Sequence, residues 1–109
     1  MKVAIIGSRG ITNADIGKYI PPDTTLIISG GARGVDTLAE RYADEHGIEK
    51  LILLPQYELY GKNAPLIRNK AIVEHADLVI AFWDGSSHGT RFTIDYAKGR
   101  KIPCRIYIV

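Results

Sequence analysis

The chain has 109 residues, of which 46% are hydrophobic and 24% are charged, as expected of one compact domain spanning residues 1–109. Its 14 basic and 12 acidic residues give a formal net charge of +2, too small a surplus to coat nucleic acid or an anionic membrane. A single cysteine, Cys104, excludes an internal disulfide. Without a signal peptide or an apolar run of about 20 residues, the sequence predicts a soluble, cytoplasmic protein with no membrane contact.

Apolar runs of strand length alternate with helical patterns along the whole chain. Four of these runs are unbroken, as in strands buried on both faces of a sheet, and the last one alternates, as in a half-exposed edge strand. The expected elements are, in order, a strand over 3–6, a weak helix over 13–19, a strand over 26–28, a helix over 35–45, a strand over 51–54, a helix over 64–75, a strand over 77–82, a helix over 90–98 and a strand over 104–109.

Turn and cap residues mark the ends of these elements. Asn13 and Asn63 are expected to cap the helices that follow them, and Pro65 fits the first turn of the second of these helices. Gly47 is expected to end the helix before it. Residues 55–64 make the longest irregular connection, and a loop of that length suggests a functional role.

Strands that alternate with helices predict an α/β fold with one parallel sheet covered on both faces, because right-handed crossovers place a helix between successive parallel strands. We expect a single Rossmann-like, doubly wound domain with five strands in the order 3-2-1-4-5. Ligands of such sheets bind at the carboxyl ends of the strands, beside the switch point, which here falls between the first and fourth strands. The loops expected there cover residues 7–13, 29–34, 55–63 and 83–90.

The turn after the second strand is a candidate anion site. Gly30, Gly31 and Gly34 allow the backbone to approach a ligand, and the first N–H groups of the following helix point outward. A plain strand-to-helix connection explains the same glycines equally well. No G-x-G-x-x-G or G-x-x-x-x-G-K-[ST] pattern fits, which disfavours the classes of NAD dehydrogenases and P-loop nucleotide hydrolases.

Cationic side chains outnumber acidic ones in these loops and in the first helical turns. They are Arg9, Arg33, Lys62, Arg68, His88 and Arg91, against Asp36, Glu58 and Asp84. This local surplus, with helix N-termini at Gly34 and at Gly89-Thr90, suits a phosphate or a nucleotide.

Other chemistries receive less support. The segment 84–88 contains the aspartate, serine and histidine of a hydrolase triad, but neighbours in sequence rarely reach the geometry of a triad. The three histidines lie on different elements without further ligands at metal-binding spacing, so no metal site is predicted. Trp83, at the end of a strand, could stack on a base or cover the core.

Five motifs, in their order along the chain, resemble those of the SLOG superfamily. They are Gly7-Ser8-Arg9, Ser29-Gly30-Gly31-Ala32-Arg33-Gly34-Val35-Asp36, Arg68-Asn69, Asp77 before a strand, and Gly89-Thr90. The superfamily joins the LOG-type phosphoribohydrolases, the DNA-processing protein A family and small stand-alone domains labelled DUF2493. The chain is most similar to the last group, over essentially its whole length.

The resemblance implies a Rossmann-like domain that binds a nucleotide or nucleotide derivative. Our leading hypothesis is such a binding domain, with a sensor as one possible role and without a further cofactor. The site residues that the resemblance implies are Gly7, Ser8, Arg9, Ser29, Gly30, Gly31, Arg33, Gly34, Asp36, Arg68, Asn69, Gly89 and Thr90. In this alignment Gly89 and Thr90 would hold a phosphate. Because relatives commonly pair, the resemblance also implies a homodimer.

The resemblance breaks at the catalytic loop of LOG-type enzymes. Those enzymes carry the pattern P-G-G-x-G-T-x-x-E. This chain has Trp83-Asp84-Gly85 in place of P-G-G, and Thr93 stands where the glutamate is expected. Arg68 matches an arginine that assists catalysis in those enzymes, so Arg68 and Asp84 are the catalytic candidates, and Asp36 could also supply a carboxylate. Two alternatives therefore stay open: an N-glycosidic (phosphoribo)hydrolase, and a single-stranded DNA binder, for which the charge of +2 is low.

Overall fold

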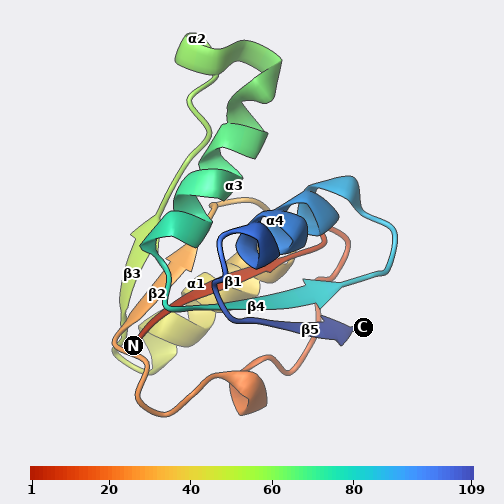
Figure 1. Cartoon of the computed structure of the whole chain (residues 1–109). Coiled ribbons are helices and arrows are strands. Elements are labelled where there is room, and N and C mark those ends of the chain that lie inside the picture. The colour runs from red at the N-terminus through yellow and green to blue at the C-terminus, as the bar shows by residue number, and fades with distance from the viewer.

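A computed structural model describes all residues from 1 to 109 and contains one five-stranded, wholly parallel sheet (Figure 1). The strand order is β3-β2-β1-β4-β5, so the predicted order and the predicted α/β class are confirmed. The strands are β1 (Lys2–Gly7), β2 (Leu26–Ser29), β3 (Glu49–Ile52), β4 (Leu78–Trp83) and β5 (Cys104–Ile108).

Three long helices cover the two faces of the sheet. Figure 1 shows α1 on one face and α3 and α4 together on the other. The helical segments are α1 (Val35–Glu45), the single turn α2 (Tyr57–Tyr60), α3 (Ala64–His75), α4 (His88–Gly99) and the 3-10 turns η1 (Gly17–Tyr19) and η2 (Gly61–Asn63). None of these helices has the length and apolar character needed to cross a membrane.

The hydrophobic core consists of two layers, one on each face of the sheet. Along β1, Val3 and Ile5 join the layer under α1, whereas Ala4 and Ile6 join the layer under α3 and α4. This explains why the strand reads as an unbroken apolar run. Each large aliphatic side chain buried in these layers contributes about 1.5–3 kcal/mol.

The predicted helix over residues 13–19 is wrong. Only the 3-10 turn η1 forms there, and Asn13 caps no helix. Ile16 and Ile20 are nevertheless buried against the layer under α1, so this segment covers the sheet without regular helix. Gly17 lets this segment pack closely against Tyr42 of α1, because a Cβ at residue 17 would lie 2.8 Å from the Tyr42 ring.

The third strand and the following loop also differ from the predictions. β3 covers Glu49–Ile52 rather than residues 51–54, and as an edge strand it is exposed or half-buried rather than buried on both faces. Leu54 lies beyond the end of the strand and is exposed. The connection 55–64 is not irregular, since it contains α2 and η2. Pro65 lies in the first turn of α3 as predicted, but Asn63 makes no capping hydrogen bond with its side chain.

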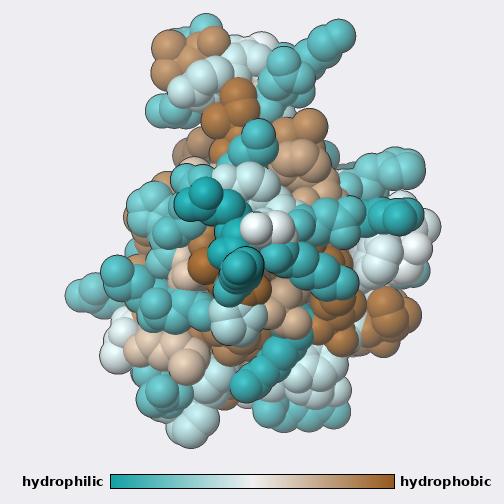
Figure 2. All heavy atoms as spheres, in the orientation of Figure 1, coloured by the Kyte–Doolittle hydropathy of each residue, from teal (hydrophilic) through white to brown (hydrophobic).

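Residues 54–66 form an arm that projects from the body of the domain, with α2 at its tip (Figure 1). Five of the eight large hydrophobic side chains that are exposed in the whole chain belong to this arm. They are Leu54, Tyr57, Leu59, Tyr60 and Leu66. Figure 2 shows hydrophobic residues along the arm as well as hydrophilic ones, so the arm is an amphipathic surface rather than a polar loop.

Candidate functional site

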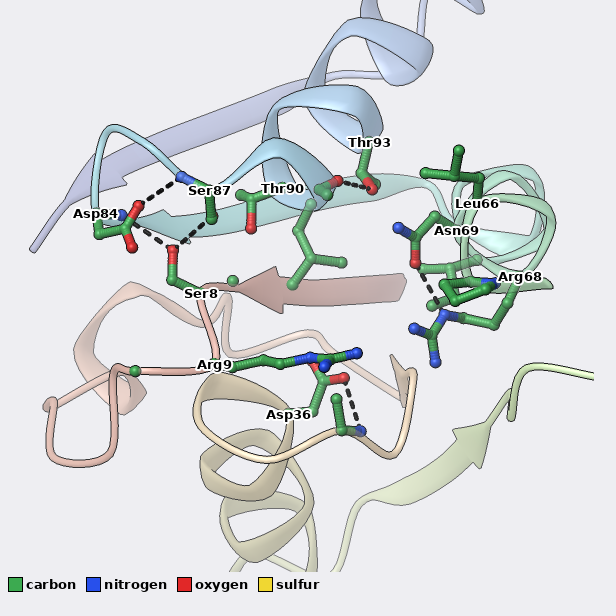
Figure 3. Close-up of a pocket in the computed structure, with 17 residues that line it drawn as sticks. Ser8, Arg9, Asp36, Leu66, Arg68, Asn69, Asp84, Ser87, Thr90 and Thr93 are labelled. Atoms are coloured by element: carbon green, nitrogen blue, oxygen red, sulfur yellow. Dashed lines mark hydrogen bonds between the residues drawn. The ribbon is translucent and has the colours of Figure 1, made fainter. Parts of the chain in front are cut away.

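A pocket of about 400 Å³ opens at the carboxyl edge of the sheet, beside the ends of β1 and β4 (Figure 3). This is the predicted switch point, and the volume is in the range of small-molecule sites. Eight of the predicted site residues line the pocket: Gly7, Ser8, Arg9, Asp36, Arg68, Asn69, Gly89 and Thr90. The catalytic candidate Asp84 and the position of the missing glutamate, Thr93, line it as well.

The start of α4 presents free backbone donors to this pocket. The N–H groups of His88, Gly89 and Thr90 precede the first intrahelical hydrogen bond, which Arg91 donates to the Ser87 carbonyl at 3.3 Å. No side chain caps the helix. A Cβ at Gly89 would have no neighbour within 4 Å, and Gly89 lines the pocket, so the space beside the first turn of the helix is open. An open helix N-terminus of this kind is a favourable place for an anion.

Two threonines of α4 line the pocket in different ways. Thr93 Oγ1 donates a hydrogen bond to the Gly89 carbonyl at 2.9 Å and so supports the first turn of the helix. The Thr90 hydroxyl makes no hydrogen bond to the protein. Because no fully buried side-chain oxygen or nitrogen lacks a partner, Thr90 Oγ1 must be accessible, and Figure 3 shows it directed into the pocket.

Ser8 and Asp84 hold the loop between β4 and α4 in place. Asp84 Oδ1 accepts hydrogen bonds from the backbone N–H groups of Ser86 at 2.9 Å and Ser87 at 2.8 Å. Ser8 Oγ accepts the N–H of Asp84 at 3.1 Å and lies 2.9 Å from Ser87 Oγ. The bonds from Ser86 and then Ser87 lower the pKa of Asp84, so this carboxylate stays ionised. Its hydrogen bonds go to Ser86 and Ser87 and none goes to His88, so the segment does not form a triad.

Arg68 connects α3 to the ends of two strands. Its Nη1 donates to the carbonyl of Gly30, after β2, and to that of Leu53, after β3, at 3.4 Å. Its Nε donates to Asn69 Oδ1 at 2.8 Å. Burial lowers the pKa of Arg68, the charge of Asp36 opposes this shift, and nearby Arg9 adds to it. Arg68 is 9% exposed, and its hydrogen bonds give it a structural role. Its third nitrogen, Nη2, has no partner in the protein and is accessible to a ligand.

Five of the predicted site residues do not line the pocket. They are Ser29, Gly30, Gly31, Arg33 and Gly34. Ser29 Oγ accepts a long hydrogen bond, 3.5 Å, from the Gly31 N–H, and Arg33 is exposed outside the pocket.

Gly30 and Gly34 are needed for packing between loops. A Cβ at Gly30 would lie 2.6 Å from Arg68 Nη1, and a Cβ at Gly34 would lie 2.5 Å from the Arg9 carbonyl oxygen. Gly34 also has φ +80°, which side chains disfavour. The glycine turn therefore shapes one wall of the pocket by admitting Arg68 and the loop after β1, and the start of α1 is covered by that loop.

Asp36 brings a buried carboxyl to the same wall. It is 8% exposed, and its Oδ2 accepts a hydrogen bond from the Ala32 N–H at 3.1 Å. Burial raises the pKa of Asp36 to about 6, although the bond from Ala32 and the charge of Arg68 oppose this shift. A perturbed carboxyl in a pocket is typical of functional sites.

The pKa of Asp36 predicts how stability depends on pH. The Asp36 carboxyl has a pKa near 3.8 in the unfolded chain and about 6 in the folded protein, so the folded protein binds this proton more tightly. The proton's contribution to the free energy of unfolding is therefore full below about pH 4 and is lost as the pH rises through about 6. Ionised Asp36 then costs up to about 2–3 kcal/mol. Asp36→Asn should therefore be more stable than the wild type in urea unfolding, by about 1–2 kcal/mol more at pH 8 than at pH 5. A difference that is the same at both pH values would contradict this.

Seven further residues line the pocket that were not among the predicted site residues, although Gly10, Ala32 and Ser87 lie in loops expected at this edge. The seven are Ile6, Gly10, Ala32, Pro65, Leu66, Ile72 and Ser87. Pro65, Leu66 and Ile72 come from α3, whose side chains form the wall opposite Asp36. The Arg68-Asn69 motif was the available signal that this helix reaches the site.

Trp83 serves the core rather than the pocket. Its Nε1 donates to the Ser87 carbonyl at 3.1 Å, and its ring packs against the layer under α3 and α4. No group of three or more His, Cys, Asp or Glu side chains lies together as a metal site would require.

The fold and the pocket define a Rossmann-like α/β domain with a ligand-sized site at its switch point. The chain is 35% identical over 88 residues to the "Gene 61 protein" of Mycobacterium phage D29, and the match covers 75% of this chain and 70% of the phage protein. The chain belongs to the family of that phage protein. No family model and no solved structure matches this chain.

Proposed function

We propose that the protein binds a nucleotide or a nucleotide derivative in this pocket, with a phosphate at the start of α4. The observation that carries the proposal is the open helix N-terminus at Gly89 and Thr90, in one pocket with the guanidinium groups of Arg9 and Arg68 (Figure 3). Free N–H groups and guanidinium groups are the donors that phosphates prefer. The resemblance to the SLOG superfamily supports the same ligand class.

The rest of the pocket suits a ligand larger than a phosphate ion. Pro65, Leu66 and Ile72 supply an apolar wall, and Asn69 stands beside them (Figure 3 labels Leu66 and Asn69). The side-chain amide of Asn69 receives the Arg68 bond on its oxygen, so its NH₂ group is left to donate to a ligand. An apolar wall with one polar group is a common environment for a base.

Binding without turnover is the role that we favour. Thr93 cannot replace a glutamate as an acid or base, and Oδ1 of Asp84 is occupied by the backbone N–H groups of Ser86 and Ser87. We therefore expect negligible release of ribose 5-phosphate from nucleoside monophosphates, measured as reducing sugar after overnight incubation. Robust turnover that is lost in Asp84→Ala or Asp36→Asn would favour the hydrolase alternative.

The binding proposal is tested by titrating the four nucleoside monophosphates and a single-stranded DNA of about 20 residues at two salt concentrations. For a strand binder, log K should fall with log salt at a slope of about −0.7 per phosphate neutralised. We expect at least one mononucleotide to bind and the strand to bind no more tightly. Tight, strongly salt-dependent binding of the strand without any mononucleotide binding would overturn the proposal.

A homodimer is the assembly that we propose, formed through the arm of residues 54–66. A single surface that is both apolar and projecting, with Leu59 69% exposed at its tip, suits a two-fold contact between identical patches. Light scattering should give twice the chain mass of 12.0 kDa, and Leu59→Lys should give one chain mass. A wild-type mass of 12.0 kDa at tens of micromolar protein would reject the dimer.

A further inference from the structure

Asp36 has an acceptor that the protein leaves unused. Its Oδ2 accepts the Ala32 N–H at 3.1 Å, and the Gly30 N–H also lies near this carboxyl, whereas Oδ1 forms no hydrogen bond of normal geometry within the protein. Since no fully buried side-chain oxygen lacks a partner, Oδ1 must be accessible, and Asp36 lines the pocket. An ionised carboxylate can accept about four hydrogen bonds, so acceptor capacity remains at Oδ1 for a ligand.

The cations nearby do not form a close ion pair with this carboxylate. The two ion pairs in the structure within 4.0 Å, Lys50 with Asp44 and Arg91 with Asp95, both lie elsewhere. The nearby guanidinium of Arg68 is bound to the carbonyls of Gly30 and Leu53 instead. Asp36 is therefore a buried charge that the fold neither neutralises directly nor saturates with donors, and a neutral donor from a ligand would satisfy it.

The chemistry of the carboxylate selects the part of the ligand that it contacts. A phosphate would be repelled, whereas hydroxyl groups donate to a carboxylate without adding charge. In a 5′-nucleotide the sugar lies between the phosphate and the base. In Figure 3, Asp36 lies between the end of the pocket with Ser8 and Ser87, beside the start of α4, and the end with Leu66 and Asn69.

We propose that Asp36 accepts hydrogen bonds from ribose hydroxyls and makes the site selective for ribonucleotides over 2′-deoxyribonucleotides. This inference rests on the proposed function and specifies its ligand class. A site built to bind a hydroxyl discriminates against the analogue that lacks it, because the buried acceptor is then left unpaired. Losing one hydrogen bond to a charged group should weaken binding by about ten- to a hundredfold.

The experiment is a calorimetric titration of wild-type protein with the four nucleoside 5′-monophosphates and their four 2′-deoxy counterparts. Asp36→Asn is the test variant, since it keeps the shape and removes the charge. Asp95→Asn is the matched control, because Asp95 is exposed on α4 outside the pocket. We expect a ribose preference of at least about tenfold in the wild type and in Asp95→Asn, and about threefold or less in Asp36→Asn.

The possible outcomes separate this inference from the proposed function. Equal affinity for the two series, or a ribose preference that Asp36→Asn leaves unchanged, would overturn the role of Asp36 while nucleotide binding stands. A preference that follows the base and not the sugar would also overturn it, because the carboxylate would then be reading a base edge. If neither series binds, the proposed function fails and the inference fails with it. The wild-type comparison alone decides the matter if the variant does not fold.

Discussion

Replacing Gly89 by valine is expected to abolish nucleotide binding, by at least about a hundredfold in affinity, without loss of stability. The residue is helical, and a Cβ there would meet no atom within 4 Å, so valine fits the folded protein. In a helix, valine is if anything favoured over glycine by a few tenths of a kcal/mol. Its branched side chain would instead occupy pocket space beside the free N–H groups at the start of α4.

The chain offers a matched control for this change at the other end of the same helix. Gly99 is the last residue of α4, its Cβ position is equally open, and it lies outside the pocket. Titration with the mononucleotide that binds best should show loss in Gly89→Val and wild-type affinity in Gly99→Val. Wild-type affinity in Gly89→Val would exclude the start of α4 as the phosphate site.

Arg68→Ala is expected to destabilise the protein by about 2–4 kcal/mol as well as to weaken binding. The change leaves the carbonyls of Gly30 and Leu53 without their donor and removes the cation beside Asp36. The cost should appear as a lower urea midpoint. Arg68→Lys should restore only part of the stability, because an ammonium group cannot reproduce the planar fork of a guanidinium.

Arg9→Ala is the comparison that separates binding from folding. Arg9 also lines the pocket, but it is exposed and makes no ion pair or side-chain hydrogen bond to the protein. We expect weaker nucleotide binding with unchanged urea unfolding in Arg9→Ala. If Arg68→Ala unfolds at the wild-type urea concentration, the structural role assigned to Arg68 is wrong.

The strand order could be predicted because the local pattern and the topology rules agree. The apolar run from Val3 to Ile6 is unbroken because alternate side chains enter the two core layers. A strand that is apolar on both faces is typical of the centre of a parallel sheet. The glycine turn and Gly89-Thr90 could be placed at one sheet edge because the carboxyl ends of parallel strands share it.

The errors arise where tertiary packing overrides local signals. Residues 13–16 form no helix, although Ile16 and Ile20 are buried in the core, so the apolar spacing that favoured a helix is satisfied here by an irregular segment. The single turns α2 and η2 are too short to show a helical periodicity of apolar residues, so the sequence did not predict them. The role of Gly30 was also hidden, because the glycine is required by Arg68, which lies 38 residues away along the chain.

The most direct measurement of the central claim is a map of backbone amide resonances in ¹⁵N-labelled protein during titration with the mononucleotide that binds best. A phosphate at the start of α4 should shift the amide signals of His88, Gly89 and Thr90 most strongly, with a smaller change at Ala32, beside Asp36. Signals of η1, on the opposite face of the sheet, should stay in place. Shifts that spare His88, Gly89 and Thr90, or no shifts with any mononucleotide, would contradict nucleotide binding in this pocket.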